Sequence, residues 1–123
     1  MKYIRIFSNG FKEYYCNGLL HREDGPACVS KNGLQKEYFI KGKRHREDGG
    51  PTEEYYFDND YDHSAEAVPV NYTCYKAYHF HNNLHRVDGP AVQYPDGEEK
   101  YYLFGKQYSY EDWLKFRKLI TFL

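Results

Sequence analysis

HREDGPA, at residues 21–27, is the most informative stretch of the chain, because the chain repeats it in two further places. It returns as HREDGGP at 45–51 and as HRVDGPA at 85–91, and each copy follows an aromatic run that ends in a Gly or Asn turn. Catalysis needs one site, whereas a repeated scaffold needs its turn residues in every copy. We therefore interpret this HRxDG motif as the turn of a repeated structural unit.

The spacing of the motif divides the chain. His21 and His45 are 24 residues apart, whereas His45 and His85 are 40 residues apart. The longer interval contains an acidic stretch, DNDYDHSAE at 58–66, that interrupts the pattern. We therefore predict a single domain over 1–123, with repeats near 11–33, 34–57 and 75–98, a partial repeat at 99–110 and an insertion at 58–74.

Aromatic residues alternate with polar ones along most of the chain, which is typical of strands with one buried face. Asn-Gly or Asp-Gly pairs at 9–10, 32–33 and 96–97 supply the positive φ angles that tight hairpins need. Consecutive strands should then pair in antiparallel order. We expect a mainly β fold, an antiparallel β-meander of hairpin repeats, with strands near 3–7, 11–16, 27–30, 34–40, 52–57, 72–80, 91–94 and 99–104.

The C-terminal segment has helical rather than strand periodicity. Ser109 can cap a helix with Asp112 three residues later, and apolar side chains follow at helical spacing from Trp113 onward. We predict an α-helix over 110–119 that covers one face of the sheet or closes an exposed edge.

The HRxDG motif has its own turn chemistry. Each Asp can accept backbone N–H groups, the Gly after it can adopt a left-handed conformation, and the following Pro fixes φ at the entry to the next strand. Replacing such an Asp by Ala should destabilise the fold by about 1–3 kcal/mol, because backbone donors would be left unpaired. The second copy has an additional Gly, so we expect a bulge there. The predicted structural turn residues are His21, Asp24, Gly25, His45, Asp48, Gly49, His85, Asp88 and Gly89.

Composition narrows the function classes. The formal net charge of -1 gives no overall attraction to nucleic acid or to an anionic membrane, and no apolar run reaches the roughly 18 residues of a membrane span. Three cysteines without CxxC spacing favour reduced thiols. These features predict a soluble cytoplasmic protein. The chain is also rich in Tyr, and the doubled tyrosines at 14–15, 55–56 and 101–102 should place one ring on each face of the sheet.

The aromatic strand, the Gly turn and the 24-residue period together resemble MORN-type repeats, in particular the variant in bacterial antitoxin-like proteins. The residues that carry the resemblance are YCNG at 15–18, YFIKG at 38–42 and YLFG at 102–105. The chain is more similar still to phage, giant-virus and bacterial proteins whose units read as an aromatic strand, Asn-Gly and HREDGPA. This resemblance covers about residues 11–110. It implies β-hairpin ribbons that contact proteins or lipids, and it brings no catalytic residues with it.

Three other interpretations stay open. The His and Asp of one motif copy could form a hydrolytic pair, although the triplication favours a structural role. His79 and His81 would share a strand face and could bind zinc or nickel, but a bare surface His-x-His pair is commoner. Basic residues between 36 and 46 could bind nucleic acid together with stacking tyrosines, although acidic residues lie among them.

The leading hypothesis is a non-enzymatic protein-binding module, with inhibition of a host factor by a phage or virus as its expected task. An acidic, aromatic loop can dock on a basic groove, and loops added to a scaffold often carry recognition. A small-ligand or nucleic-acid binder that uses exposed tyrosines is the second hypothesis, and a hydrolase is the third. We expect no cofactor and no bound metal. The predicted partner-binding residues are Asp58, Asp60, Tyr61, Asp62, Glu66 and Tyr55.

Overall fold

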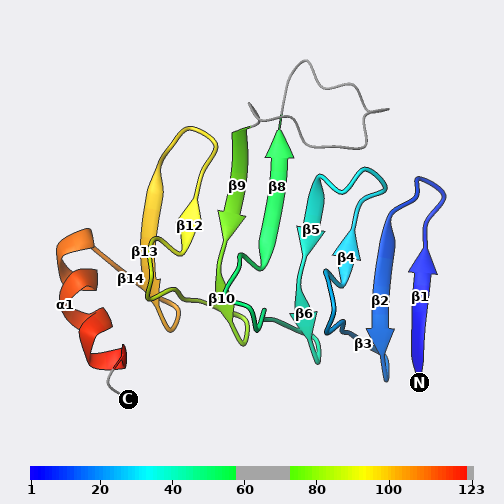
Figure 1. Cartoon of the computed structure of the whole chain (residues 1–123), viewed down its shortest axis with the longest axis horizontal. Helices are drawn as coiled ribbons and strands as arrows, with labels where there is room; N and C mark the ends of the chain where they lie inside the picture. Colours follow the sequence, from blue (N-terminus) through cyan, green and yellow to red (C-terminus); the bar gives the residue numbers. More distant parts are fainter. Residues whose placement is uncertain (58–72, 122–123) are drawn as a thin grey trace.

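The computed structural model describes residues 1–57 and 73–121. These residues form a mainly β protein with a single C-terminal helix (Figure 1). Its elements are β1 (Lys2–Ile6), β2 (Lys12–Cys16), β3 (Leu19–Leu20), β4 (Cys28–Val29), β5 (Gln35–Glu37), β6 (Phe39–Ile40), β7 (Lys43–Arg44), β8 (Glu53–Phe57), β9 (Thr73–Ala77), β10 (His79–Phe80), β11 (Asn83–Leu84), β12 (Val92–Gln93), β13 (Glu99–Leu103), β14 (Lys106–Tyr108) and α1 (Tyr110–Thr121).

The main sheet is an antiparallel meander. Its strand order is β1-β2-β4-β5-β8-β9-β12-β13-β14, and β3 pairs with β2 (Figure 1). Apart from the short arms described below, neighbours in the sheet are neighbours in the chain, which confirms the predicted fold class. The predicted strand at 34–40 is divided into β5 and β6, and the one at 72–80 into β9 and β10.

Short returning arms were not expected from the sequence. After β2, β6, β10 and β13 the chain turns through residues with positive φ and comes back as β3, β7, β11 and β14, respectively. The turns are linked from unit to unit. The N–H of Gly42 bonds to the carbonyl of Leu20 at 2.8 Å, and the N–H of Gly105 bonds to the carbonyl of Leu84 at 2.8 Å. Each hairpin tip is thereby fastened to the arm of the preceding unit.

The predicted tight turns lie at the opposite end of the sheet. The N–H groups of Gly10, Gly33 and Gly97 bond to the carbonyls of Phe7, Ser30 and Tyr94 at 2.9, 3.0 and 3.0 Å, and each Gly has a positive φ. These hairpins are confirmed. The same end of the sheet carries the ends of β8 and β9, which the pairing of Phe57 with Thr73 holds together.

Cross-strand pairing defines two faces of the sheet. One face carries Tyr14, Val29, Lys36 and Glu54, which follow one another from strand to strand, and we call it the loop face because the HRxDG loops contact it. The other carries Tyr15, Cys28, Glu37 and Tyr55, and we call it the tyrosine face. Tyr14 and Tyr15 lie on opposite faces, as predicted. One deeply buried position recurs after each HRxDG motif, and it is occupied by Ala27, Thr52 and Ala91.

The helix α1 begins as predicted and extends two residues further than predicted. The hydroxyl of Ser109 accepts the N–H of Asp112 at 3.2 Å, which is an N-terminal cap. Trp113 is buried against Tyr101, with ring centroids 4.8 Å apart, and its Nε1 donates to the carbonyl of Arg86 at 3.0 Å. Because Tyr101 points to the loop face, α1 packs against β13 and β14 on that face, at the end of the sheet opposite β1 (Figure 1). Among the described residues no helix is long and apolar enough to cross a membrane.

Candidate functional site

The arginine of each motif copy makes the same two contacts. Its guanidinium carbon lies over a tyrosine ring of its own unit, and its Nη1 donates to a proline carbonyl at the end of the loop. The ring distances are 4.0, 4.0 and 3.8 Å for Arg22 over Tyr14, Arg46 over Tyr38 and Arg86 over Tyr78. The distances to the carbonyl oxygens of Pro26, Pro51 and Pro90 are 3.2, 2.9 and 3.2 Å. The arginine therefore folds the loop back onto the sheet.

The motif glycines have a different role from the one predicted. Gly25 and Gly89 do not adopt positive φ angles, so the expected left-handed conformation is wrong for both. They leave room for the arginine instead, because a Cβ on Gly25 would lie 3.0 Å from Cζ of Arg22, and one on Gly89 would lie 3.2 Å from Cζ of Arg86. In the second copy Gly50 takes this place, with 2.6 Å to Cζ of Arg46. The close approach of the guanidinium explains the glycine in every copy.

Gly49 is the additional residue of the second copy. It has a φ of 80°, which agrees with the predicted left-handed conformation at this one position. The expected bulge is not a strand bulge, because Gly49 lies in the loop that precedes β8. The loop absorbs the additional residue before pairing resumes at Glu53.

The histidines connect one unit to the next. Nδ1 of His21 accepts the backbone N–H of Lys41 at 2.9 Å, and Nδ1 of His85 accepts that of Phe104 at 2.9 Å. His45 instead stacks on His81 with ring centroids 4.3 Å apart, and its buried Nδ1 has no hydrogen bond within the part of the chain that the structure describes. All three motif histidines thus lie at contacts within the array.

Two motif aspartates pair with the arginine of their own motif copy, whereas backbone N–H partners were predicted. Asp24 accepts from Nε of Arg22 at 2.9 Å, which lowers the pKa of Asp24, yet its side chain is 86% exposed. Asp88 is also exposed. Only Asp48 accepts a backbone N–H from a later residue of its own loop, as predicted. The N–H of Gly50 donates to its carboxylate at 3.0 Å. The anchoring of buried backbone donors that we expected of Asp24 is therefore wrong.

The sequence left open a hydrolytic pair between the His and the Asp of one motif copy. In the loops these two side chains pair with other residues instead. In the first two copies the histidine Nε2 faces the glutamate two residues later, at 3.4 Å for Glu23 and 3.0 Å for Glu47. The aspartates pair with the arginines in these copies, at 2.9 Å for Asp24 and 2.6 Å for Asp48. The charged atoms of the motif are thus engaged with one another.

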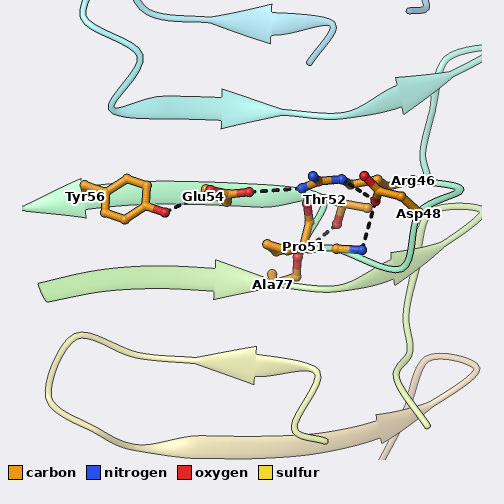
Figure 2. Close-up of polar contacts among 8 residues, drawn as sticks. Arg46, Asp48, Pro51, Thr52, Glu54, Tyr56 and Ala77 are labelled. Carbon is orange, nitrogen blue, oxygen red and sulfur yellow. Dashed lines mark hydrogen bonds and ion pairs between the residues drawn. The ribbon is translucent and has the colours of Figure 1, made fainter. Parts of the chain in front are cut away.

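The second unit contains a polar network that sequence reasoning missed (Figure 2). Nη1 of Arg46 also contacts a carboxylate oxygen of Glu54 at 3.0 Å, and the hydroxyl of Tyr56 donates to the other oxygen at 3.0 Å. Burial, and then the bond to Glu54, raise the pKa of Tyr56 to about 12. On the tyrosine face Glu53 pairs with Arg44. Neither carboxylate is therefore available to attract a partner, although both lie a few residues before the acidic stretch at 58–66.

His79 and His81, the two possible metal ligands that the sequence left open, make different contacts. His79 lies in β10 with its Nδ1 2.6 Å from the hydroxyl of Thr52, whereas His81 lies in the turn with a φ of 45°. Burial, and then the charge of Arg44, lower the pKa of His79 to about 4. Among the described residues no group of three His, Cys, Asp or Glu side chains could hold a metal ion.

The three cysteines carry free thiols. Burial above all, together with the nearby carboxylates of Glu37 and Glu13, raises the pKa of Cys28 to about 12. Cys28 is therefore a poor nucleophile, because the thiolate is the reactive form.

A row of tyrosines crosses the tyrosine face next to the insertion. Tyr55 stacks on Tyr75 with centroids 5.7 Å apart, Tyr75 meets Tyr94 edge-on at 5.7 Å, and Nζ of Lys100 lies 5.4 Å from the centroid of Tyr94. The hydroxyl of Tyr55 donates to Glu37, and burial raises the pKa of Tyr55. We call Tyr55, Tyr75, Tyr94 and Lys100 the tyrosine row. Its strands β8 and β9 are those from which the chain enters and leaves residues 58–72.

The predicted partner-binding residues divide between described and undescribed parts of the chain. Tyr55 belongs to the tyrosine row, and the remaining five lie outside the described residues: Asp58, Asp60, Tyr61, Asp62 and Glu66. Neither a family model, nor a curated protein, nor a solved structure matches the chain.

Proposed function

We propose that this protein is a non-enzymatic binding module that acts by contact with another protein through the tyrosine row. The observation that carries the proposal is the row of contacting rings on the sheet face away from α1 and the HRxDG loops, in which Tyr55 stacks on Tyr75 and Tyr75 meets Tyr94 edge-on. Tyrosine gives a large amphipathic contact area with little conformational entropy to lose. Rings already held by stacking lose less still on binding.

The chemistry of the loops supports a binding role over a catalytic one. The imidazoles of His21 and His85 accept backbone N–H groups, and the arginines are held by rings and carbonyls. Groups fixed in this way in successive copies serve the repeat itself. A MORN-like array is the scaffold that we propose for this role, on the sequence resemblance alone.

A polyanionic ligand is the less favourable occupant of the row. The carboxylates of Glu37 and Glu53 lie on the same face, with Arg44 between them, and Lys100 is the cation at the far end. Nucleic-acid binding depends on phosphate neutralisation by several cations. The row is therefore better suited to a protein surface than to a phosphate backbone.

The insertion at 58–66 extends this proposal. Its carboxylates would steer a basic partner toward the row, and the resemblance to phage and giant-virus proteins makes a cytoplasmic host factor the partner that we propose, with inhibition as the outcome. Deletion of residues 60–65 should then weaken binding and reduce its dependence on salt, without loss of fold. Wild-type affinity after the deletion would leave the row as the whole contact surface.

The experiment that tests the row compares two substitutions of tyrosine. Tyr94→Ala removes an end of the row, whereas Tyr110→Ala removes an exposed ring on α1. Each variant is immobilised, host lysate is passed over it, and the affinity of any retained protein is then measured with the purified partner by titration calorimetry.

We expect Tyr94→Ala to weaken binding by about tenfold or more, as for an interface aromatic, and Tyr110→Ala to bind like the wild type. Both variants must keep the wild-type circular dichroism spectrum. Equal binding by both variants would contradict the assignment of the row. Tight binding of a labelled single-stranded oligonucleotide, lost in Tyr94→Ala, would favour the nucleic-acid alternative.

A further inference from the structure

Strand β1 forms an open edge of the sheet. Among the residues that the structure describes it pairs with β2 alone, and it lies at the end of the sheet opposite α1 (Figure 1). All five of its residues are exposed, including Tyr3 at 46%, Ile4 at 51% and Ile6 at 64%. Proteins commonly protect such an edge with charged side chains, a bulge, a proline or a covering segment, because its unpaired backbone groups can bind another strand. The segment KYIRI has no proline and is paired with β2 without a bulge, so its protective residues are the charged Lys2 and Arg5.

The hydrogen bonds of β1 show which backbone groups face outward. The carbonyl of Met1 accepts the N–H of Asn17 at 3.0 Å, and the N–H of Phe7 bonds to the carbonyl of Phe11 at 2.9 Å. In an antiparallel pair the residues that bond to the neighbour alternate along the strand. The odd-numbered residues of β1 therefore bond to β2, and the N–H and C=O groups of Lys2, Ile4 and Ile6 point away from the sheet.

We propose that two copies of this chain associate through β1, in antiparallel orientation and with Ile4 opposite Ile4. In this register every outward residue gains a hydrogen-bonded partner: Lys2 pairs with Ile6, Ile4 with Ile4 and Ile6 with Lys2. A two-fold axis then passes through the Ile4 pair, as an isologous contact requires. The two sheets become one continuous sheet.

The side chains of β1 are self-complementary in the same register. Tyr3 of each copy faces Arg5 of the other, so the guanidinium can lie beside the ring on the tyrosine face. The two Ile4 side chains meet on the loop face, where they would cover each other. Neither Lys2 nor Arg5 faces its own counterpart.

Neighbouring registers are less favourable. A shift of two residues toward the C-terminus pairs Arg5 with Arg5 and leaves the outward groups of Lys2 without partners. A shift of two residues toward the N-terminus leaves the outward groups of Ile6 unpaired. A shift of one residue would place residues that bond to β2 opposite residues whose backbone groups point outward. Such pairs cannot form the hydrogen bonds of an antiparallel sheet. The Ile4 register is thus specified by both the backbone and the charges.

A charge exchange at Ile4 tests the proposal. Analytical ultracentrifugation of the wild-type chain, up to about 1 mM, should show a reversible dimer of the weak affinity typical of small interfaces. Ile4→Lys and Ile4→Glu should each weaken dimerisation by about tenfold or more, because like charges face each other across the axis. An equimolar mixture of the two variants should dimerise again. This recovery is expected only if residue 4 faces residue 4.

A control and a second measurement separate the proposal from effects on folding. Leu119→Lys places the same charge on α1, at a side chain that is 65% exposed, and should dimerise like the wild type. In the wild type, hydrogen exchange of the Lys2, Ile4 and Ile6 amides should slow as concentration rises, while the amides of Tyr3 and Arg5 do not change. A wild-type chain that stays monomeric throughout, or charged variants that do not recover on mixing although folded, would overturn the proposal.

Discussion

Nδ1 of His85 accepts the backbone N–H of Phe104 at 2.9 Å, and the two rings stack with centroids 4.1 Å apart. Phe104 has a φ of 49° and belongs to the tip of the next hairpin. His21 and Lys41 repeat the hydrogen bond in the first motif copy, two copies earlier. An imidazole nitrogen that accepts an N–H bond must be unprotonated, so these histidines act as neutral acceptors. The histidine of the HRxDG motif therefore joins each unit to the turn that follows it.

Removal of this acceptor should destabilise the fold. We expect His85→Ala to lower the free energy of unfolding by about 1–3 kcal/mol, since the N–H of Phe104 loses its partner and the ring stack is lost. His85→Asn should be milder, because the amide oxygen can take the place of Nδ1. Urea denaturation followed by circular dichroism measures both. Equal losses in the two variants would show that the stack, and not the hydrogen bond, provides the stability.

Acid should weaken the same contacts. Burial lowers the pKa of His85, and burial together with Arg44 lowers the pKa of His79 to about 4. Between the ordinary histidine pKa of about 6.5 and these lowered values the unfolded chain binds protons that the folded chain does not. These two histidines should therefore leave stability unchanged between about pH 6.5 and pH 8 and lower it as the pH decreases below about 6.5.

The measurement is the melting temperature between about pH 8 and pH 4.5. Asp24 and Asp48, whose pKa values are lowered in the fold, lose stability only below their ordinary pKa of about 4, so they do not act in this window. Burial raises the pKa of Glu53, so this carboxyl adds stability near the acid end of the window and opposes the histidines there. The test is therefore the difference between the wild type and His85→Asn, which should lose less stability as the pH falls. Profiles of the same slope in the two proteins would contradict the neutral-acceptor role.

Sequence alone predicted the parts of the fold that depend on local chemistry. The Asn-Gly turn at Gly33 and the cap at Ser109 each act within a few residues, and both are present. The returning arms were missed because strands as short as β7 carry no periodicity. The contact between Arg46 and Glu54 was missed for another reason. It depends on how the loop folds back over β8, and the spacing of residues along the chain does not specify this.

The candidate site was likewise predicted only in the part that depends on local sequence. Tyr55 was selected for its position beside the insertion, but the tyrosine row also needs Tyr75 and Tyr94 from other strands. Their meeting follows from strand order and register, which a single sequence specifies only in part. Glu54 lies close in sequence to the acidic stretch at 58–66, yet it pairs with Arg46, and this pairing could not be predicted from position in the chain.

Gly50 has no side chain, which leaves room for the guanidinium of Arg46, and this leads to a prediction. Gly50→Ala should destabilise the fold by about 1–3 kcal/mol, because the new methyl group would lie 2.6 Å from Cζ of Arg46 and displace a guanidinium that holds Pro51 and Glu54. In an Arg46→Ala background the same substitution should have little further effect. A double-mutant cycle in urea measures this coupling. Additive losses would mean that the glycine is needed for its own backbone conformation.

The last prediction concerns α1 as the cap of the array. Trp113, which is 4% exposed, bonds to the carbonyl of Arg86, and Nη1 of Arg117 bonds to that of Val87 at 3.2 Å, so the helix satisfies the final HRxDG loop. Terminal units of repeat arrays need such closure, and their loss destabilises the neighbouring units. Trp113→Phe, which keeps a ring but loses the N–H donor, should lower the free energy of unfolding by about 1 kcal/mol. Trp113→Ala should lower it by about 3–5 kcal/mol.

The chain contains a single Trp, so its fluorescence reports on the docking of α1 alone. In the wild type we expect urea transitions followed by Trp fluorescence and by hydrogen exchange of the β2 amides to coincide, because undocking of the cap and unfolding of the sheet are one cooperative event. Leu119→Ala, on the exposed side of the same helix, should leave both transitions unchanged. A fluorescence transition at distinctly lower urea than that of β2 would show that α1 detaches without consequence for the sheet, and the array would then be stable without this cap.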